Sequence, residues 1–309
     1  MSTQVPRLFA GLVDDAAVFP PGSASLPDAL AAHRGHRDSW YADLVGPLLL
    51  PASRLAELAA LLDAAERIAA DERIAVGIIG DVPLDRLDEA RAAADPRLTV
   101  RQVEAAVAKR GEDPLPGLAT LIDLARGAAK DAPAAGPGSA AGPAEGSALD
   151  WYAEIPLTFG LSSALDALAA ARADGVPIAA KFRTGGLAAE LFPTPVELAA
   201  VIGACRDRDV PFKLTAGLHQ ATRHLDPETG FTHHGFGNVL AATLAAAEGA
   251  EVDAVAVLLA ATDPLPVVEQ VRARREARRP LWIGFGSCSI LEPLTDLIRL
   301  GLVNGRFDR

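Results

Sequence analysis

The sequence has few cysteines and no long hydrophobic run. Its two cysteines, Cys205 and Cys288, do not make the framework of several disulfides that holds small secreted domains together. No apolar run reaches the roughly 18 residues that a membrane-spanning helix needs, and the N-terminal stretch MSTQVPRLFAG lacks a signal-peptide pattern. We therefore expect a cytoplasmic protein that has no membrane as its partner.

Basic residues are fewer than acidic residues in this sequence. The chain has 29 basic and 40 acidic residues, and its formal net charge is −11 at pH 7. This balance argues against nucleic acid or an anionic membrane surface as a partner. Half of the 309 residues are hydrophobic, so the chain can bury a large core. We expect a small-molecule substrate and assign no cofactor, and a homo-oligomer is compatible with the sequence.

Lysine is scarce. Only four of the 29 basic residues are lysines (Lys109, Lys130, Lys181 and Lys213), and the other 25 are arginines. Lys181 and Lys213 stand at matching places in two strand-like stretches, VPIAAKFRTGG and VPFKLTAGLH, and are expected to lie side by side in neighbouring strands. A lysine can lose its proton and act as a nucleophile, whereas an arginine cannot. These two lysines are candidates for amine chemistry; the alternatives are that they bind an anion or form structural ion pairs.

Strand patterns alternate with helix patterns along the whole chain. Strands are predicted at 9–19, 44–50, 73–80, 98–104, 151–155, 178–183, 212–216 and 281–286. Helices are predicted at 26–33, from an N-cap at Ser53 to about 70, at 84–94, at 118–129, from a cap at Ser162 or Ser163 to 173, and at 293–300. The segment 251–261 favours a helix over a ninth strand. Eight such units favour a single-domain (β/α)8 TIM barrel over a doubly wound open sheet.

Two connections differ from the rest in composition. The segment 131–148 (DAPAAGPGSAAGPAEGSA) is of low complexity and is predicted to be a disordered insertion. Because it lies between a helix and a strand, it belongs on the N-terminal face of a barrel. The loop 215–237 holds four of the six histidines and follows a strand, which places it over the catalytic face. His219 leaves its strand after a short turn and is expected to lie nearest the chemistry.

The predicted strand ends bring carboxylates and amines together. Glu104 and Glu154 end the fourth and fifth strands, and Lys181 and Lys213 lie in the sixth and seventh. Schiff-base chemistry needs one amine that attacks a carbonyl, a neighbouring cation that lowers its pKa and an acid that moves protons. We assign catalysis to these four residues and His219. Alternatively, the two glutamates are counter-ions that keep the lysines charged.

Glycine-bearing turns at two strand ends suggest a site for an anion. One is Thr184-Gly185-Gly186, preceded by Arg183, and the other is GFGSCS at 284–289. Such turns leave backbone N–H groups for a phosphate or carboxylate, although glycine also ends strands for conformational reasons alone. The residues assigned to substrate or anion binding are Asp14, Arg183, Thr184, Gly185, Gly186, Thr215, Gly286, Ser287 and Ser289.

KFRTGG, FKLTAG and GFGSCS together resemble the motifs of class I deoxyribose-phosphate aldolases. That family is a (β/α)8 barrel with a Schiff-base lysine in its sixth strand, a second lysine in its seventh, and a phosphate-binding turn after its eighth. The resemblance implies that Lys181 forms the imine, that Lys213 lowers the pKa of Lys181, and that Glu104 stands in for a proton-shuttling aspartate. It further implies that the GFGSCS turn holds phosphate.

The chain departs from that pattern in places. Arg183 replaces a small residue, Ala216-Gly217 replaces Gly-Gly, and the histidine-rich loop is extra. The start LVDDAAVFPPG also resembles a broad set of bacterial barrel proteins with no assigned reaction. The three motifs that do match imply an aldolase-type lyase acting on a small phosphate- or carboxylate-bearing carbonyl compound.

Two other functions are compatible with the same residues. A metal-dependent hydrolase or isomerase could take ligands from the histidine-rich loop, Glu154 and Asp14. However, the chain has no HExxH motif, no H-x-H on its first strand, and histidines that crowd one loop, so we assign no metal ligand. The third hypothesis is a barrel that binds an anionic ligand without turning it over.

Overall fold

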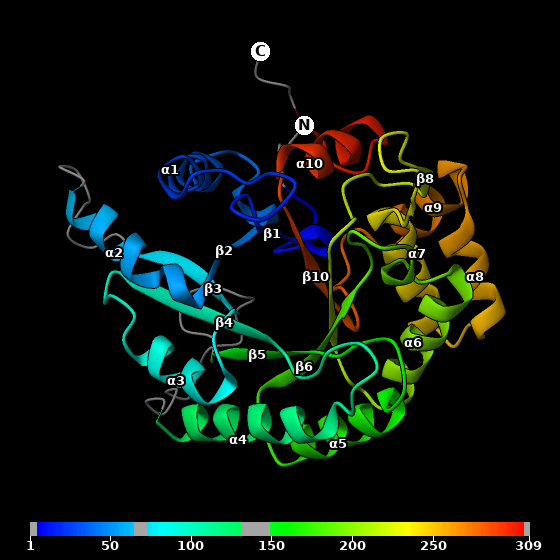
Figure 1. Cartoon of the computed structure of the whole chain (residues 1–309). Helices are drawn as coiled ribbons and strands as arrows, with labels where there is room; N and C mark the ends of the chain where they lie inside the picture. The colour runs from blue at the N-terminus through cyan, green and yellow to red at the C-terminus, as the bar shows by residue number, and fades with distance from the viewer. Residues whose placement is uncertain (1–4, 65–72, 132–148, 306–309) are drawn as a thin grey trace. The chain divides into compact units, whose positions relative to one another are not determined.

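The computed structural model describes residues 5–64, 73–131 and 149–305, and its main sheet is a closed barrel of eight parallel strands (Figure 1). Around the barrel the strand order is β1-β10-β7-β6-β5-β4-β3-β2. The predicted (β/α)8 barrel is thus confirmed, and the open sheet is not formed. The strands are β1 Val13–Asp15, β2 Val45–Pro51, β3 Ile74–Gly80, β4 Leu98–Ala106, β5 Asp150–Glu154, β6 Ile178–Arg183, β7 Phe212–Thr215 and β10 Trp282–Ser287.

Helices connect the successive strands. They are α1 Leu26–Arg37, α2 Leu55–Ala64, α3 Leu84–Ala92, α4 Leu115–Asp131, α5 Leu161–Ala173, α6 Pro195–Asp207, α7 Phe236–Ala247, α8 Val252–Ala260, α9 Pro264–Arg272 and α10 Leu291–Arg299. The helix expected within 251–261 is confirmed as α8, whereas α9 was not predicted. The insertion predicted at 131–148 falls, after its first residue, outside the described residues.

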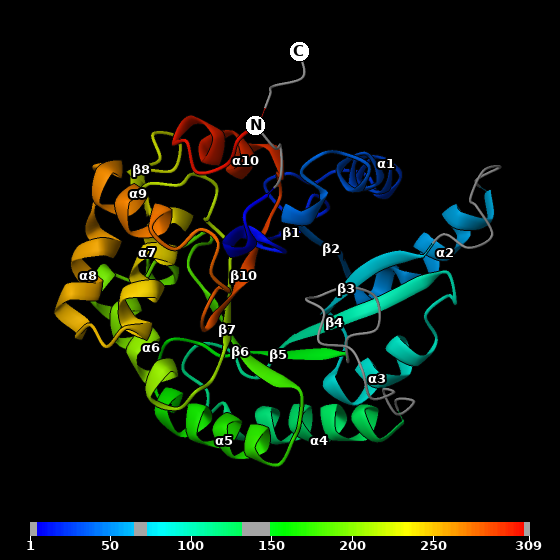
Figure 2. The same cartoon turned by 180° about the vertical axis from the view of Figure 1, so that it is seen from behind.

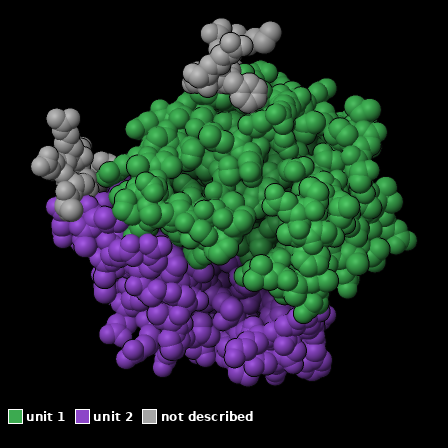
Figure 3. All heavy atoms as spheres, turned by 45° about the horizontal axis from the view of Figure 1, so that its top comes forward, with its two compact units in different colours: residues 1–46, 182–309 green, residues 47–181 purple. Residues whose placement is uncertain are grey.

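The chain packs as two compact units, coloured separately in Figure 3. One is the continuous stretch Pro47–Lys181, and the other joins Met1–Gly46 to Phe182–Arg309. Within the second unit, α8 packs against α6 and α7, and α9 packs against α7 (Figure 2). Among the described residues, no helix combines the length and the apolar character needed to cross a membrane.

Local signals explain several element boundaries. Helix α6 begins with a capping box, in which Thr194 and Glu197 each bond the other's backbone N–H, and Pro195 takes the first helical position. The cap predicted at Ser162 or Ser163 is wrong: α5 starts at Leu161, directly after Gly160 at φ 85°. Glycine adopts that left-handed conformation without steric cost, so the turn is made at Gly160, two residues before Ser162.

The second predicted cap is also wrong. Ser53 does not cap α2; it lies in a 3-10 turn, Ala52–Arg54, and its backbone N–H donates to Asp81 Oδ1 at 2.9 Å. The side chain that reaches it comes from the loop after β3, so a contact distant in sequence takes precedence over the local capping pattern.

The loop 215–237 contains a short hairpin, β8 His224–Leu225 and β9 Thr232–His233, that was not predicted. Its two strands are only two residues long, too short for any alternation to show in the sequence. His224 and His233 pair across it, with ring centroids 5.4 Å apart. The loop is therefore an ordered element.

Candidate functional site

Neighbouring strands of the Pro47–Lys181 unit place charged side chains on one face. The register pairs Glu104 of β4 with Tyr152 of β5, and Glu154 of β5 with Lys181 of β6. Side chains alternate between the two faces of a strand, and directly paired residues share a face. Glu104, Tyr152, Glu154 and Lys181 therefore lie on the same face of the sheet, and the carboxylates meet an amine there, as predicted from the strand ends.

Lys181 is buried between two carboxylates. Its Nζ lies 2.7 Å from Glu104 Oε2 and 2.9 Å from Glu154 Oε2. The side chains of Lys181 and Glu104 are 5% and 2% exposed, whereas that of Glu154 is 19% exposed. The two glutamates thus differ in solvent access, so Glu154 is the one better placed to exchange protons with water.

These contacts hold Lys181 in its charged form. Burial by itself lowers the pKa of the Lys181 ammonium, but the charges of Glu104 and Glu154 outweigh it and raise the pKa above its ordinary value. The expectation of a lowered Lys181 pKa is therefore corrected for the resting protein. The two glutamates act there as counter-ions, which the sequence left open as the alternative.

Gln102 fixes one of the two glutamates and was not singled out in the sequence. Its Nε2 donates to Glu104 Oε1 at 2.9 Å, while Glu104 Oε2 meets Lys181. Gly77 of β3 leaves the space that this amide fills, since a Cβ there would lie 2.8 Å from Gln102 Cγ. The period-2 alternation could have found Gln102, because it precedes Glu104 by two residues on the same strand.

The other strand lysine also meets a carboxylate. Lys213 Nζ forms an ion pair with Asp14 Oδ2, and both side chains are buried. Asp14 in β1 is aligned with Gly286 in β10, and Gly286 with Thr215 in β7, so the pair spans three strand ends. The prediction that the amines of Lys181 and Lys213 lie side by side stays a prediction.

A glycine in β2 makes room for the Asp14 carboxylate. A Cβ built at Gly46 would collide with Asp14 Oδ1 and come within 3.0 Å of its Cγ. Any other residue at position 46 would therefore displace the partner of Lys213. Nothing in the local sequence VGPLLLP indicates this role, because the contact joins residues from two different strands.

Asp15, the neighbour of Asp14, bonds His33 and a backbone N–H group. Its Oδ2 lies 3.1 Å from His33 Nδ1 in α1, and its Oδ1 accepts from the Ala17 N–H at 3.2 Å. Asp15 and His33 are both almost fully buried. Adjacent residues of a strand point to opposite faces, so only one of the two aspartates can accompany Lys213.

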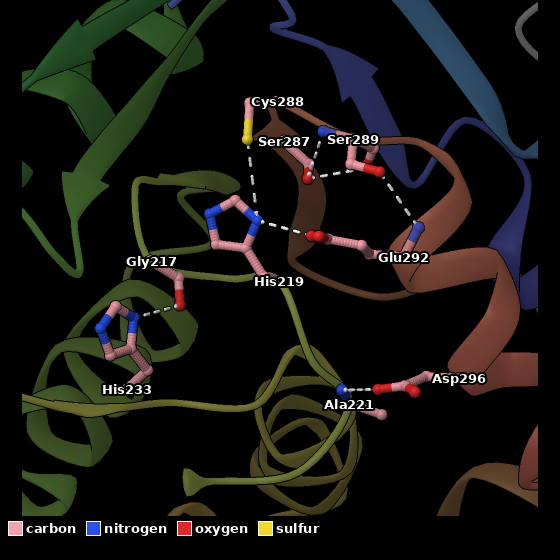
Figure 4. Close-up of polar contacts among 9 residues, drawn as sticks. All are labelled: Gly217, His219, Ala221, His233, Ser287, Cys288, Ser289, Glu292 and Asp296. Atoms are coloured by element: carbon pink, nitrogen blue, oxygen red, sulfur yellow. Dashed lines mark hydrogen bonds and ion pairs between the residues drawn. The ribbon is translucent and has the colours of Figure 1, made fainter. Parts of the chain in front are cut away.

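The polar groups of the GFGSCS turn form hydrogen bonds with one another and with the start of α10 (Figure 4). Ser287 Oγ donates to Ser289 O at 2.8 Å and accepts from the Ser289 N–H at 3.3 Å. Ser289 Oγ in turn accepts from the Glu292 N–H, in the first turn of α10, at 3.2 Å. Phosphate binding by Gly286, Ser287 and Ser289 stays a prediction, and an anion would have to compete with these bonds.

The Thr184-Gly185-Gly186 turn joins the end of β6 to the end of β7. Thr184 donates its N–H to Thr215 O at 2.9 Å and its hydroxyl to Ala216 O at 2.7 Å. A Cβ at Gly185 would lie 3.1 Å from Gly217 Cα, so the two chains touch there. These groups tie the strands together, and Arg183, which ends β6, is exposed. Their predicted role in anion binding is not tested by this packing.

His219 contacts side chains from the far end of the chain (Figure 4). Its Nδ1 lies 3.0 Å from Glu292 Oε2 in α10 and 3.9 Å from Cys288 Sγ. The Cys288 contact raises the pKa of His219, burial opposes it, and Glu292 raises it further. His219 therefore has polar partners, as a functional residue needs; Cys288 and Glu292 were not among the predicted site residues.

Two other histidines of the loop, His233 and His234, bond backbone carbonyls. His233 Nδ1 lies 3.0 Å from Gly217 O, and His234 Nε2 lies 2.8 Å from Pro193 O. Burial lowers the pKa of His234 to about 4, so its ring is neutral at pH 7. Within the described parts of the chain, no three His, Cys, Asp or Glu side chains form a group that could hold a metal ion. The metal-dependent alternative gains no support from these residues.

The chain was compared with protein-family models, curated proteins and solved structures, and nothing matches it in any of the three.

Proposed function

We propose that this protein is an aldolase-type carbon–carbon lyase that binds a small carbonyl substrate as a Schiff base on Lys181. The observation that carries the proposal is the placement of a buried amine between two carboxylates of unequal exposure. Lys181 lies toward the carboxyl end of β6, and active sites of (β/α)8 barrels lie at that end of the strands. The resemblance of KFRTGG to the aldolase motif points to the same lysine.

Each carboxylate has a distinct task in this proposal. Lys181 is charged at rest, so a proton must leave Nζ before the amine attacks a carbonyl carbon. Glu154, which is 2.9 Å away and partly exposed, accepts that proton. It then protonates the carbinolamine oxygen, and water leaves as the C=N bond forms. Glu104, held by Gln102, keeps its negative charge beside the nitrogen and stabilises the protonated imine.

The same groups then serve bond cleavage. Glu154, now a carboxylate, takes the proton of the hydroxyl group on the β carbon of the bound substrate. The electrons of that O–H bond form the aldehyde C=O, the bond between the α and β carbons breaks, and its electron pair moves toward the protonated imine, which leaves an enamine on Lys181. The enamine carbon takes a proton from the acid form of Glu154, and hydrolysis of the imine frees the second product. Positioned acids and bases of this kind accelerate such proton transfers by about 10²–10⁴-fold.

Trapping the imine tests the proposal directly. The protein is incubated with short aldehydes, hydroxyketones and 2-oxo acids, each with and without a phosphate group, and is reduced with borohydride. Intact mass and peptide mapping should place one adduct on Lys181. The adduct should be absent from Lys181→Met and undiminished in Lys109→Met, a matched change at an exposed lysine.

Two further results decide the roles. Glu154→Gln should slow adduct formation by about 10²-fold or more while leaving Lys181 in place. The proposal fails if a carbonyl compound that raises the melting temperature of the protein gives no adduct at Lys181, or gives as much on Lys109 as on Lys181.

A further inference from the structure

Cys288 is held in place beside His219 on the loop that follows β10 (Figure 4). Its Sγ lies 3.9 Å from His219 Nδ1, and a Cβ built at Gly22 would come within 2.8 Å of the Cys288 Cβ. The bonds between Ser287 and Ser289 fix the backbone on either side. The thiol therefore keeps one position relative to the imidazole, although it is only partly buried.

Glu292 determines which atom carries the proton. An ionised carboxylate only accepts hydrogen bonds, so His219 Nδ1, 3.0 Å from Glu292 Oε2, must be protonated to bond it. Cys288 Sγ lies 3.9 Å from the same nitrogen. With the proton on Nδ1, the sulfur is the acceptor and the imidazole N–H is the donor. Reactive cysteines are found in partly exposed places beside such a neighbour, because the positive end of an N–H group attracts the negative charge of an attacking sulfur.

The second cysteine of the chain provides the contrast. Cys205 lies in α6 with no exposed surface, and burial raises the pKa of its thiol to about 12. It has neither solvent access nor an imidazole partner. The two thiols of one molecule thus differ in solvent access and in having an imidazole neighbour, and both bear on cysteine reactivity.

We propose that Cys288, with His219 and Glu292, is a peroxide-reactive thiol that is oxidised to a sulfenic acid. This activity is separate from the Schiff-base chemistry and does not rest on it. Hydrogen peroxide suits the site because it is small and uncharged, so it can approach a partly covered sulfur next to a carboxylate. Cys205, the only other thiol in the sequence, is fully buried, so it is not exposed to resolve the product as a disulfide.

The reaction balances without a further reactant. The thiol gives its proton to solvent, and Sγ attacks one oxygen of the peroxide. The O–O bond breaks, an S–O bond forms, and the hydroxide that leaves takes up a proton and becomes water. Sulfur loses two electrons and the peroxide gains them. An added thiol returns the sulfenic acid to the free cysteine through a mixed disulfide.

Kinetic labelling of the folded wild-type chain tests the proposal. The protein is treated with hydrogen peroxide and dimedone, which traps sulfenic acids, and each cysteine peptide is quantified by mass spectrometry over time. We expect Cys288 to be labelled at least about tenfold faster than glutathione at pH 7, since glutathione has no imidazole beside its thiol. Cys205 should stay unlabelled until urea unfolds the chain, after which the two cysteines should react alike.

Variants of His219 and Glu292 test whether these neighbours cause the faster labelling of Cys288. His219→Gln should slow labelling of Cys288 about tenfold, and Glu292→Gln should slow it less. His224→Gln, a change in the same loop at a residue that stacks on His233, should leave it unchanged. A folded wild-type protein whose Cys288 reacts no faster than glutathione overturns the proposal, with or without the variants, and so does a His219→Gln protein that reacts at the wild-type rate.

Discussion

Replacing Lys181 by methionine should destabilise the protein strongly, whatever its substrate. The change keeps the length of the side chain but removes the ammonium that lies 2.7 Å from Glu104, whose side chain is only 2% exposed. Removing one partner of a buried ion pair typically costs about 3–5 kcal/mol, because the other charge stays buried. With a denaturant dependence of ~3 kcal/mol per molar urea, the midpoint should fall by roughly 1–1.7 M.

Urea unfolding followed by far-UV circular dichroism and tryptophan fluorescence measures this midpoint. The second change Glu104→Gln in the Lys181→Met background should recover most of the loss, since it removes the uncompensated carboxylate. Lys109→Met, at an exposed position, should shift the midpoint little. A Lys181→Met protein as stable as the wild type would show that Glu104 and Lys181 are not a buried, mutually neutralising pair.

Three further changes probe other parts of the fold. Gly46→Ala should displace Asp14 and lower the melting temperature, and an unchanged melting curve would contradict the packing. The pKa of His234, about 4 when folded against an ordinary 6.5, means that the unfolded chain binds the proton first. Stability should therefore fall by up to roughly 3 kcal/mol as the pH drops from about 6.5 to about 4, and His234→Asn should remove that part of the loss in urea titrations. Asn238→Ala removes a buried amide that donates to Leu258 O at 2.7 Å and to Ala261 O at 2.8 Å. It should cost about 2–4 kcal/mol, and a loss below ~0.5 kcal/mol in thermal unfolding would contradict it.

The barrel and its lysine strands were predictable because their signals are local. Apolar runs ending in polar residues and glycine, each followed by a helical period, identify strand–helix units one at a time. Glu104, Glu154 and Lys181 were predicted to meet because they lie toward the ends of neighbouring strands, and the structure brings the three together. The helix at 251–261 was predicted over a strand on its alanine content and on the Thr-Asp-Pro sequence that follows it.

What could not be predicted depends on contacts between distant segments. Glu292 lies in the first turn of a helix, where an acidic residue is expected simply because it interacts favourably with the helix dipole. It nevertheless contacts His219, which is 73 residues earlier in the chain. Gly46 gives no local sign that it accommodates Asp14. The charge state of Lys181 was misjudged because its pKa depends on the distances to two carboxylates, which a one-dimensional pattern does not contain.

The division into two units has a consequence for the order in which the chain can assemble during synthesis. Pro47–Lys181 is continuous, so all the partners of the Lys181 ion pairs described above have been made once residue 181 has been added. The other unit is split: its first 46 residues must wait for the last strand, because Val13 in β1 pairs with Phe285 in β10. Contacts between such distant residues form slowly. A nascent chain stopped before β10 would therefore expose the edge of β1, and the barrel would lack its closing strand until nearly the end of translation.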